Sequence, residues 1–186
     1  MSPFEFMFSL FGLLLGLSIA EIAGGFSRAY DARAERSMGW MAPALAIILL
    51  LDLLSFWYGA WAWRDTSLSF VMILTAAVVG LLYYFAATQV FPREGVSTRP
   101  SDHFMMHRGP VAFCVIVANL IMFAPNFAIA ALAGDWPDVI RPELFANLGY
   151  FILLGVAGFH PNRRWIGASL VLAVILLIGF PVMSGL

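Results

Sequence analysis

The chain has 186 residues, of which 62% are hydrophobic and 11% are charged, and its formal net charge is −1. Soluble domains carry about 25% charged and about 45–50% apolar residues, so this composition excludes an ordinary soluble domain and predicts a polytopic membrane protein. The near-neutral net charge says nothing about nucleic acid, but the chain has no basic surface patch to bind it, and we expect no nucleic-acid partner.

Six hydrophobic segments are long enough to cross a hydrocarbon core of about 30 Å. In chain order they are Phe4–Phe26, Met41–Ala62, Leu68–Phe91, Val111–Ala133, Leu144–Phe159 and Trp165–Met183. The short connections between them leave no room for a second domain. We therefore expect one all-α domain over residues 1–186, with six transmembrane helices paired in three hairpins.

The arginines predict the orientation of these helices. All ten basic residues are Arg, and eight of them lie in the first, third and fifth connections. Because positively charged loops stay on the cytoplasmic side, loops 27–40, 92–110 and 160–164 are predicted to be cytoplasmic. Both termini are then outside, which agrees with an even number of spans.

The first segment has a ridge of small residues at every fourth position, formed by Gly12, Gly16, Ala20 and Gly24. Such a ridge lets another helix approach closely in lipid. Glu21 lies on the neighbouring face, roughly 8 Å from the inner end at 1.5 Å per residue. It either pairs with a cytoplasmic Arg or belongs to a cytoplasmic vestibule.

The second segment carries Asp52 within an otherwise apolar run. A carboxylate at the centre of a spanning helix costs roughly 2.5–3.5 kcal/mol on insertion scales, so we expect a function or a partner for it. Ser55 follows at i+3 and shares its face. No Arg lies at the same depth, so we expect the carboxyl to be protonated at neutral pH.

Three asparagines lie in the fourth and fifth segments. Asn119 and Asn126 are seven residues apart on one face, beside Pro125, and Asn147 is in the fifth segment. Asp52, Asn119 and Asn147 are each about 14–18 Å from their inner ends, so they share one slab near the midplane. Midplane polar groups beside an interrupted helix are typical of transporter sites. The alternative is that they only hold neighbouring helices together through interhelical hydrogen bonds.

The connection before the fourth segment contains the densest polar cluster: Asp102, His103, His107 and Arg108, with His160 in the fifth connection. Ser101 is a candidate N-cap for a short helix that places both histidines on one face. Such a helix would lie at the membrane surface. The cluster could instead bind a lipid headgroup or a phosphate, or a metal, although the i, i+4 pair lacks an assured third ligand.

Residue counts argue against several cofactors. The chain has no Lys to form a Schiff base with retinal or pyridoxal phosphate, and its single cysteine cannot hold an iron–sulfur cluster. All three histidines are predicted on the cytoplasmic side, which leaves a midplane haem without ligands. We predict no cofactor.

Several short motifs are shared with a known type of protein. They are Pro3-Phe4-Glu5-Phe6, Gly16-Leu17-Ser18-Ile19 before Arg28, Phe56-Trp57 through Trp61 to Arg64-Asp65, Phe91-Pro92 and His107-Arg108. Together they resemble small multi-pass bacterial inner-membrane proteins. The resemblance spans most of the first four segments and implies a bacterial inner membrane, and it assigns no catalytic or binding residue.

Three functions agree with these features. The first is a channel or transporter-like conduit for an ion or small solute, lined by Asp52, Ser55, Asn119, Asn126 and Asn147 with Glu21 near its cytoplasmic mouth. The second is an accessory subunit that docks on a membrane partner or on a second copy through the small-residue ridge. The third is a membrane enzyme acting at the cytoplasmic face through its histidines. In each case membrane lipid is a partner.

Overall fold

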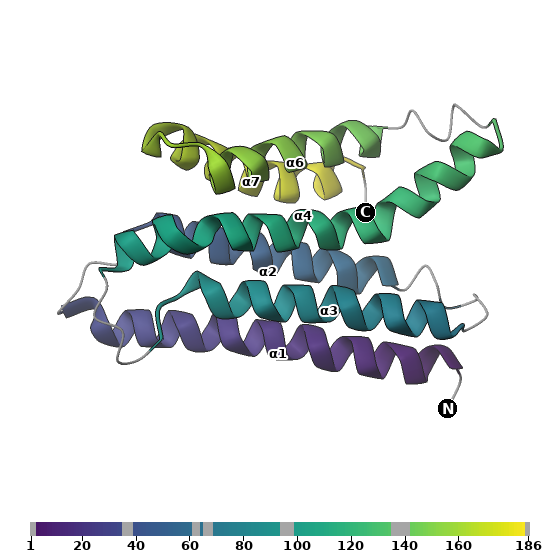
Figure 1. Cartoon of the computed structure of the whole chain (residues 1–186), viewed down its shortest axis with the longest axis horizontal. Helices are drawn as coiled ribbons and strands as arrows, with labels where there is room; N and C mark the ends of the chain where they lie inside the picture. The colour runs from purple at the N-terminus through teal and green to yellow at the C-terminus, as the bar shows by residue number, and fades with distance from the viewer. Residues whose placement is uncertain are drawn as a thin grey trace.

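The computed structural model describes residues 3–34, 39–60, 64, 69–93, 99–134 and 142–184, and over these residues the chain is all-helical (Figure 1). Its elements are α1 (Pro3–Asp31), the 3-10 turn η1 (Ala32–Ala34), α2 (Met41–Ala60), α3 (Phe70–Val90), α4 (Pro100–Leu132), α6 (Pro142–Phe159) and α7 (Arg163–Ser184). The all-helical class predicted from the sequence is confirmed.

Local capping explains where several helices begin. The Ser69 side chain accepts a hydrogen bond from the Met72 amide at 3.2 Å and caps α3. The Asn162 side chain does the same for the Arg164 amide at 2.9 Å, at the start of α7. Helix α4 starts with Pro100, at the position where a missing N–H costs nothing.

The predicted start of the fourth helix was wrong. A surface helix separate from a span beginning at Val111 was expected, whereas α4 is one continuous helix of 33 residues from Pro100. Pro110 removes only one backbone donor, and the helix continues through it. Residues 100–110 of the predicted loop 92–110 are therefore helical. Further along, α4 bends towards its C-terminal end (Figure 1), and Pro125 lies in this half of the helix.

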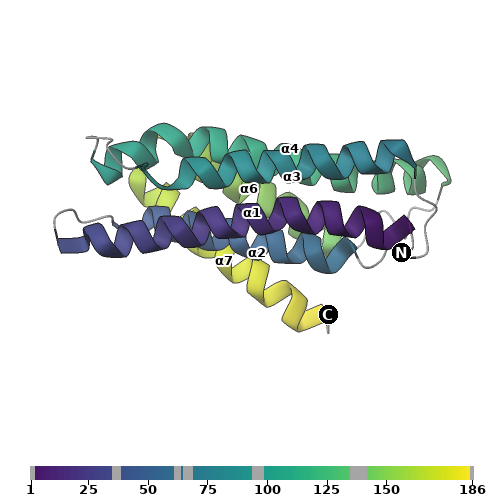
Figure 2. The ribbon, with the colours of Figure 1, turned by 90° about the horizontal axis from the view of Figure 1, so that it is seen from below.

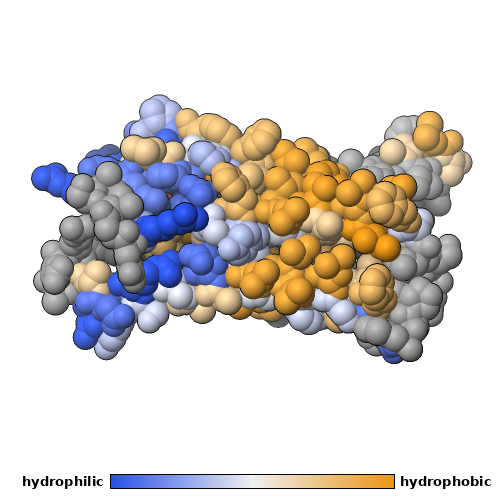
Figure 3. Space-filling model, turned by 60° about the horizontal axis from the view of Figure 1, so that its bottom comes forward, coloured by the Kyte–Doolittle hydropathy of each residue, from blue (hydrophilic) through white to orange (hydrophobic). Residues whose placement is uncertain are grey.

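Four helices, α1 to α4, are long and apolar enough to cross a membrane, and α6 contains a shorter apolar stretch, Leu144–Phe159. These helices indicate a membrane protein. Figure 3 shows hydrophilic side chains gathered at one end of the elongated molecule, with an apolar belt beyond them. The same end in Figure 1 holds the last turn of α1 and the first turns of α2, α4 and α7. We call it the polar end.

Neighbours in space are not always neighbours in sequence. Helix α3 packs mainly against α1 and α4, while α6 packs against α4 and α7, and α2 contacts α7 more than any other helix. Figure 2 shows α7 diverging from the other helices towards the C terminus. Helix α1 therefore has its main contact with α3 and a smaller one with α2, its predicted hairpin partner.

Glycines allow the closest helix crossings. A Cβ atom on Gly25 would lie 2.1 Å from the Phe91 ring, and one on Gly80 would lie 2.7 Å from the Leu14 Cβ. Both contacts are between α1 and the α3 region. A Cβ on Gly158 of α6 would lie 2.6 Å from the Ala112 Cβ of α4. Since lipid is as apolar as the side chains, close packing of this kind drives association of helices in a membrane.

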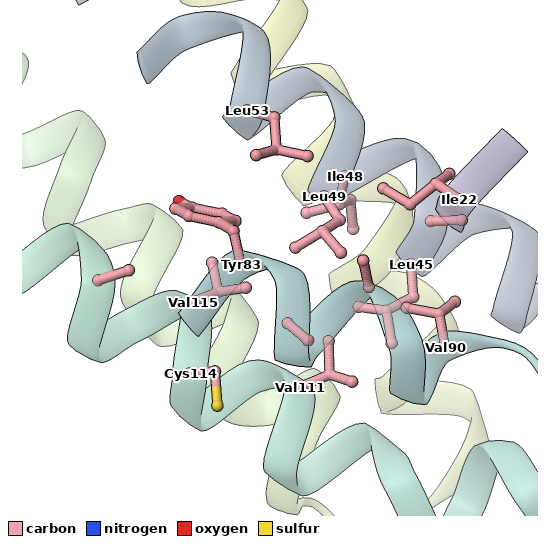
Figure 4. Packing of buried hydrophobic residues seen from close by; sticks show 14 of the residues in the cluster. Ile22, Leu45, Ile48, Leu49, Leu53, Tyr83, Val90, Val111, Cys114 and Val115 are labelled. Carbon is pink, nitrogen blue, oxygen red and sulfur yellow. The ribbon is translucent and has the colours of Figure 1, made fainter. Parts of the chain in front are cut away.

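The core lies between these helices and is almost entirely apolar. Figure 4 shows Leu45, Leu49 and Leu53 of α2 facing Tyr83 of α3 and Val111 and Val115 of α4. Cys114 is also buried there. The polar exceptions in this layer, Asp52 and Asn119, each have only 2% of their surface exposed.

Candidate functional site

Three side chains from three helices form a buried polar network. Asp52 of α2, Tyr83 of α3 and Asn119 of α4 are at most 2% exposed. The Tyr83 hydroxyl donates to Asp52 Oδ2 at 2.5 Å, and Asn119 Nδ2 donates to the same oxygen at 3.0 Å. The contact between Asp52 and Asn119 agrees with the shared depth estimated from the sequence.

The hydrogens of the Asn119 amide can be assigned by counting. Its Nδ2 lies 3.0 Å from three acceptors: Asp52 Oδ2, the Tyr83 hydroxyl oxygen and the Val115 carbonyl. An amide nitrogen has two hydrogens. One bonds to the carbonyl four residues earlier in α4, and the other is shared between the carboxyl and the phenol. Asp52 Oδ2 thus receives two donors, which leaves Oδ1 as the oxygen that can hold a proton.

Tyr150 of α6 brings a fourth helix to this network. Its side chain is only 3% exposed and its hydroxyl lies near the Asp52 carboxyl, but no acceptor among the described residues meets hydrogen-bond geometry for it. A buried hydroxyl without a hydrogen bond costs free energy, so it is a group available for a rearranged bond. We call Asp52, Tyr83, Asn119 and Tyr150 the midplane network.

Two of these residues were not predicted from the sequence. Tyr83 lies in an apolar segment beside Tyr84, and nothing in the segment distinguishes them, yet Tyr83 is fully buried and Tyr84 is 38% exposed. Tyr150 is one turn after Asn147 in α6. A tyrosine within an otherwise apolar spanning segment is a signal that sequence analysis can use, because its hydroxyl requires a hydrogen-bond partner when it is buried.

The other predicted lining residues are placed as follows. Ser55 is exposed, whereas the Asp52 side chain is buried, and the Ser55 hydroxyl donates to the backbone carbonyl of Asp52 at 2.7 Å within α2. Asn147 is half-buried in α6 and has an interaction partner. Asn126 lies in α4, and its side chain is outside the described part of the structure.

Glu21 makes the local ion pair that was one of the two expectations for it. Arg28 Nη2 lies 2.9 Å from Glu21 Oε1, seven residues apart along α1. Both side chains are about one-third exposed. The pair lies towards the polar end, where it partly neutralises the carboxylate.

The two histidines of α4 are joined to backbone carbonyls. His103 Nε2 donates to the Gln89 carbonyl at 3.0 Å, and His107 Nδ1 donates to the His103 carbonyl at 2.9 Å. Their rings stack with centroids 4.0 Å apart. His103 is 8% exposed, and its bond to Gln89 joins the start of α4 to the end of α3.

The other residues of the polar cluster predicted before the fourth segment, Asp102, Arg108 and His160, have separate partners. Arg108 Nη1 donates to the Ala157 carbonyl of α6 at 2.8 Å. The backbone amide of Asn162 donates to His160 Nδ1 at 3.1 Å. The Ser101 hydroxyl lies 3.4 Å from Asp102 Oδ1. Among the residues that the structure describes, no three His, Cys, Asp or Glu side chains are arranged to hold a metal ion. Of these contacts, the Arg108 bond joins α4 to α6, and the other two are local.

Comparison with models of known families, with curated proteins and with solved structures gives no match for this chain. Its chemistry is therefore inferred from its own residues. The midplane network is the strongest candidate site, because it is the place where a carboxyl, two phenols and an amide meet inside the apolar core.

Proposed function

We propose that this chain is a multi-pass protein of the bacterial inner membrane that forms a conduit for an ion or small solute, with Asp52 as its proton-carrying group. In this proposal six helices cross the membrane and both termini are outside. The arginines of the polar end support that orientation, because positively charged segments remain in the cytoplasm. Loops 27–40, 92–110 and 160–164 are then cytoplasmic.

One observation carries the proposal. A carboxyl that is 2% exposed lies within a candidate membrane span and is held by hydrogen bonds from Tyr83 and Asn119. No cation within 4.0 Å neutralises it among the described residues. An ionisable group at such a position is costly and marks ion or proton pathways. A protonated Asp52 is neutral, so it avoids the cost of a buried charge, and it can still release its proton.

The network also offers a route for that proton. Asp52 Oδ1 is the protonation site left by the two bonds to Oδ2, and the Tyr150 hydroxyl, which lies near the carboxyl, is without a hydrogen bond among the described residues. Rotation of the Asp52 carboxyl would exchange the partners of its two oxygens. In this proposal Asn119 and Asn147 continue the polar lining, with Glu21 near the cytoplasmic mouth.

We propose that this arrangement is an occluded state of the conduit. Asp52 and Asn119 are each 2% exposed, and Phe56 and Val115, one turn away on the same helices, are also buried. Access requires α2 to separate from α3 or α4, and the bend in α4 provides a point at which that helix can move. Half-helices and bends beside midplane polar groups serve this purpose in many transporters.

The Asp52→Asn variant tests the proposal through proton flux. Protein in liposomes that contain a pH-sensitive dye is given a potassium diffusion potential, and internal acidification is recorded. The wild type is expected to acidify the vesicles, and Asp52→Asn is expected to lower the rate at least tenfold, because an amide cannot take up and release the proton.

Asp102→Asn is the matched control, because it makes the same chemical change at an exposed carboxyl. It is expected to keep the wild-type rate. Wild-type flux equal to that of empty vesicles, or equal flux in wild type and Asp52→Asn, contradicts the conduit.

A second candidate function, an accessory subunit, is favoured by the face of α1. The middle of the predicted small-residue ridge is uncovered, because a Cβ on Gly16 would meet nothing within 4 Å and Ala20 is exposed. At the two ends of the ridge, a Cβ on Gly12 would lie 3.3 Å from the Trp57 ring and one on Gly24 would lie 3.3 Å from Arg28 Nη1. An uncovered ridge of small residues can receive a helix from a partner subunit or a second copy.

The Gly16→Leu variant tests this alternative. It places a bulky side chain where the described structure has open space, so the fold is expected to be unchanged while association is lost. Native mass spectrometry of protein in nanodiscs measures the mass of the assembly. Gly155→Leu, at a second open glycine on α6, is the control. A wild-type mass equal to that of one chain contradicts the accessory role.

A further inference from the structure

A groove at the polar end lies between the start of α2 and the first turns of α7. Its volume is about 720 Å³, and its lining consists of Trp40, Met41, Arg163, Arg164, Gly167, Ala168, Val171 and Leu172. A smaller cavity of about 180 Å³ shares Trp40, Met41 and Arg163 with it and reaches Ser101, Phe104 and Met105 of α4. Sites of several hundred Å³ are large enough for a small organic ligand.

The rim of this groove is positively charged. Arg163 and Arg164 are both exposed, and no carboxylate of the described residues lies within 4.0 Å of either guanidinium group. Asn162 caps the Arg164 amide, which fixes the first turn of α7 at this point. The N-terminal end of a helix adds a partial positive charge. Two arginines and a helix terminus thus present positive potential at the mouth of the groove.

The floor of the groove is apolar, and a glycine in it lets an aromatic ring lie close to the backbone of α7. The Trp40 ring lies against Gly167, where a Cβ atom would be 2.9 Å from the ring. Beyond it, Ala168, Val171 and Leu172 follow at i, i+3 and i+4 along α7, and all three are exposed. They form a strip that runs from the arginines towards the apolar belt. Trp at such a position is typical of a membrane interface.

We propose that this groove binds an anionic phospholipid. Arg163 and Arg164 pair with the headgroup phosphate, and one acyl chain lies along Trp40, Ala168, Val171 and Leu172. A charged rim next to an apolar strip matches the two parts of a phospholipid, and basic pockets between helices on the cytoplasmic side bind such headgroups. The site is separate from the midplane network, so it is independent of the proposed conduit.

The test is a titration of the purified full chain in detergent with phosphatidylglycerol, followed by native mass spectrometry. Each Arg near an anionic lipid surface contributes on the order of 1 kcal/mol, so Arg163→Gln/Arg164→Gln is expected to weaken binding about 25-fold. Ala168→Trp fills the apolar strip without altering charge and is expected to weaken binding at least fivefold.

The control is Arg93→Gln/Arg99→Gln, which removes two exposed arginines from the same end outside the groove. It is expected to bind phosphatidylglycerol within twofold of wild type. Phosphatidylcholine with the same chains, and glycerol 3-phosphate without chains, are expected to bind at least tenfold more weakly. The proposal fails if the two double variants lose affinity equally, if Ala168→Trp binds as wild type, or if glycerol 3-phosphate binds as tightly as the lipid.

Discussion

The triple variant Asp52→Leu/Tyr83→Phe/Asn119→Leu is expected to be at least as stable as the wild type while losing all proton flux. Each replacement keeps the branching or ring shape of the original side chain. Replacing every member of a buried hydrogen-bonded group by apolar groups of similar shape is close to neutral or stabilising. The variant therefore separates a role in function from a role in holding the helices together.

The single variant Asp52→Leu is expected to behave differently. It leaves the Tyr83 hydroxyl without its acceptor, while Asn119 keeps the Val115 carbonyl and the phenol oxygen. One unsatisfied buried donor costs about 1–3 kcal/mol. Thermal unfolding in detergent should thus show a lower midpoint for the single variant than for the triple variant.

The order of these midpoints decides between the two interpretations. If the triple variant is the least stable, the midplane network is interhelical glue and its polar groups are maintained for packing. If it equals or exceeds the wild type in stability yet conducts no protons, stability does not explain why these groups are present. The flux assay with Asp52→Asn then has a stable companion that lacks three of the four members of the midplane network.

Adding one methyl group at the crossing of α4 and α6 is expected to have the second large effect. The Cβ of Gly158→Ala would lie 2.6 Å from the Ala112 Cβ, with Gly109 Cα at 3.7 Å. A Cβ cannot rotate away, so the two helices must separate. Overpacking of this kind typically costs about 1–3 kcal/mol.

Ala112→Gly in the same chain should restore the space, so the double variant is expected to recover most of the loss. Gly155→Ala is the control on α6, because a Cβ there meets nothing within 4 Å. The measurement is again the midpoint of thermal unfolding. Equal midpoints for Gly158→Ala and Gly155→Ala would show that α4 and α6 do not cross at Gly158.

Arg108 links this crossing to the polar end. Its guanidinium donates to the Ala157 carbonyl, next to Gly158, so the close approach of the two helices and the bond form together. Separation of the helices by a methyl group would lengthen that bond. The expected cost of Gly158→Ala therefore includes a contribution from a buried charged donor.

The positions of Asp52 and Asn119 along their helices explain why this part of the midplane network could be predicted. Asp52 and Asn119 are exceptional residues in apolar segments, and counting residues from the helix ends was enough to bring them to one level. Tyr83 was missed because its segment contains no charge and two adjacent tyrosines. Only the packing of α3 between α1 and α4 determines which of the two faces the core.

The polar end was harder to predict, because short polar segments have several stable conformations. Proline at 100 and 110 suggested breaks, whereas packing against α3 and α6 holds residues 100–110 in one helix with the span that follows. His103 and Arg108 contribute to that packing through carbonyls of other helices. The i, i+4 spacing of His103 and His107 suggested a ligand site. The partners of His103 and Arg108 are 14 and 49 residues away in the chain and have no local signal.

The packing of α1 against α3 has a consequence for how the protein is made. Ribosomes synthesise α1 first, and α2 follows it, yet the residue that fills the space at Gly25 is Phe91, after the end of α3. Helices that insert separately associate only afterwards. The surface of α1 that contacts α3 therefore remains uncovered until about half of the chain has been translated. The docking of α1 against α3 thus follows the synthesis of both α2 and α3.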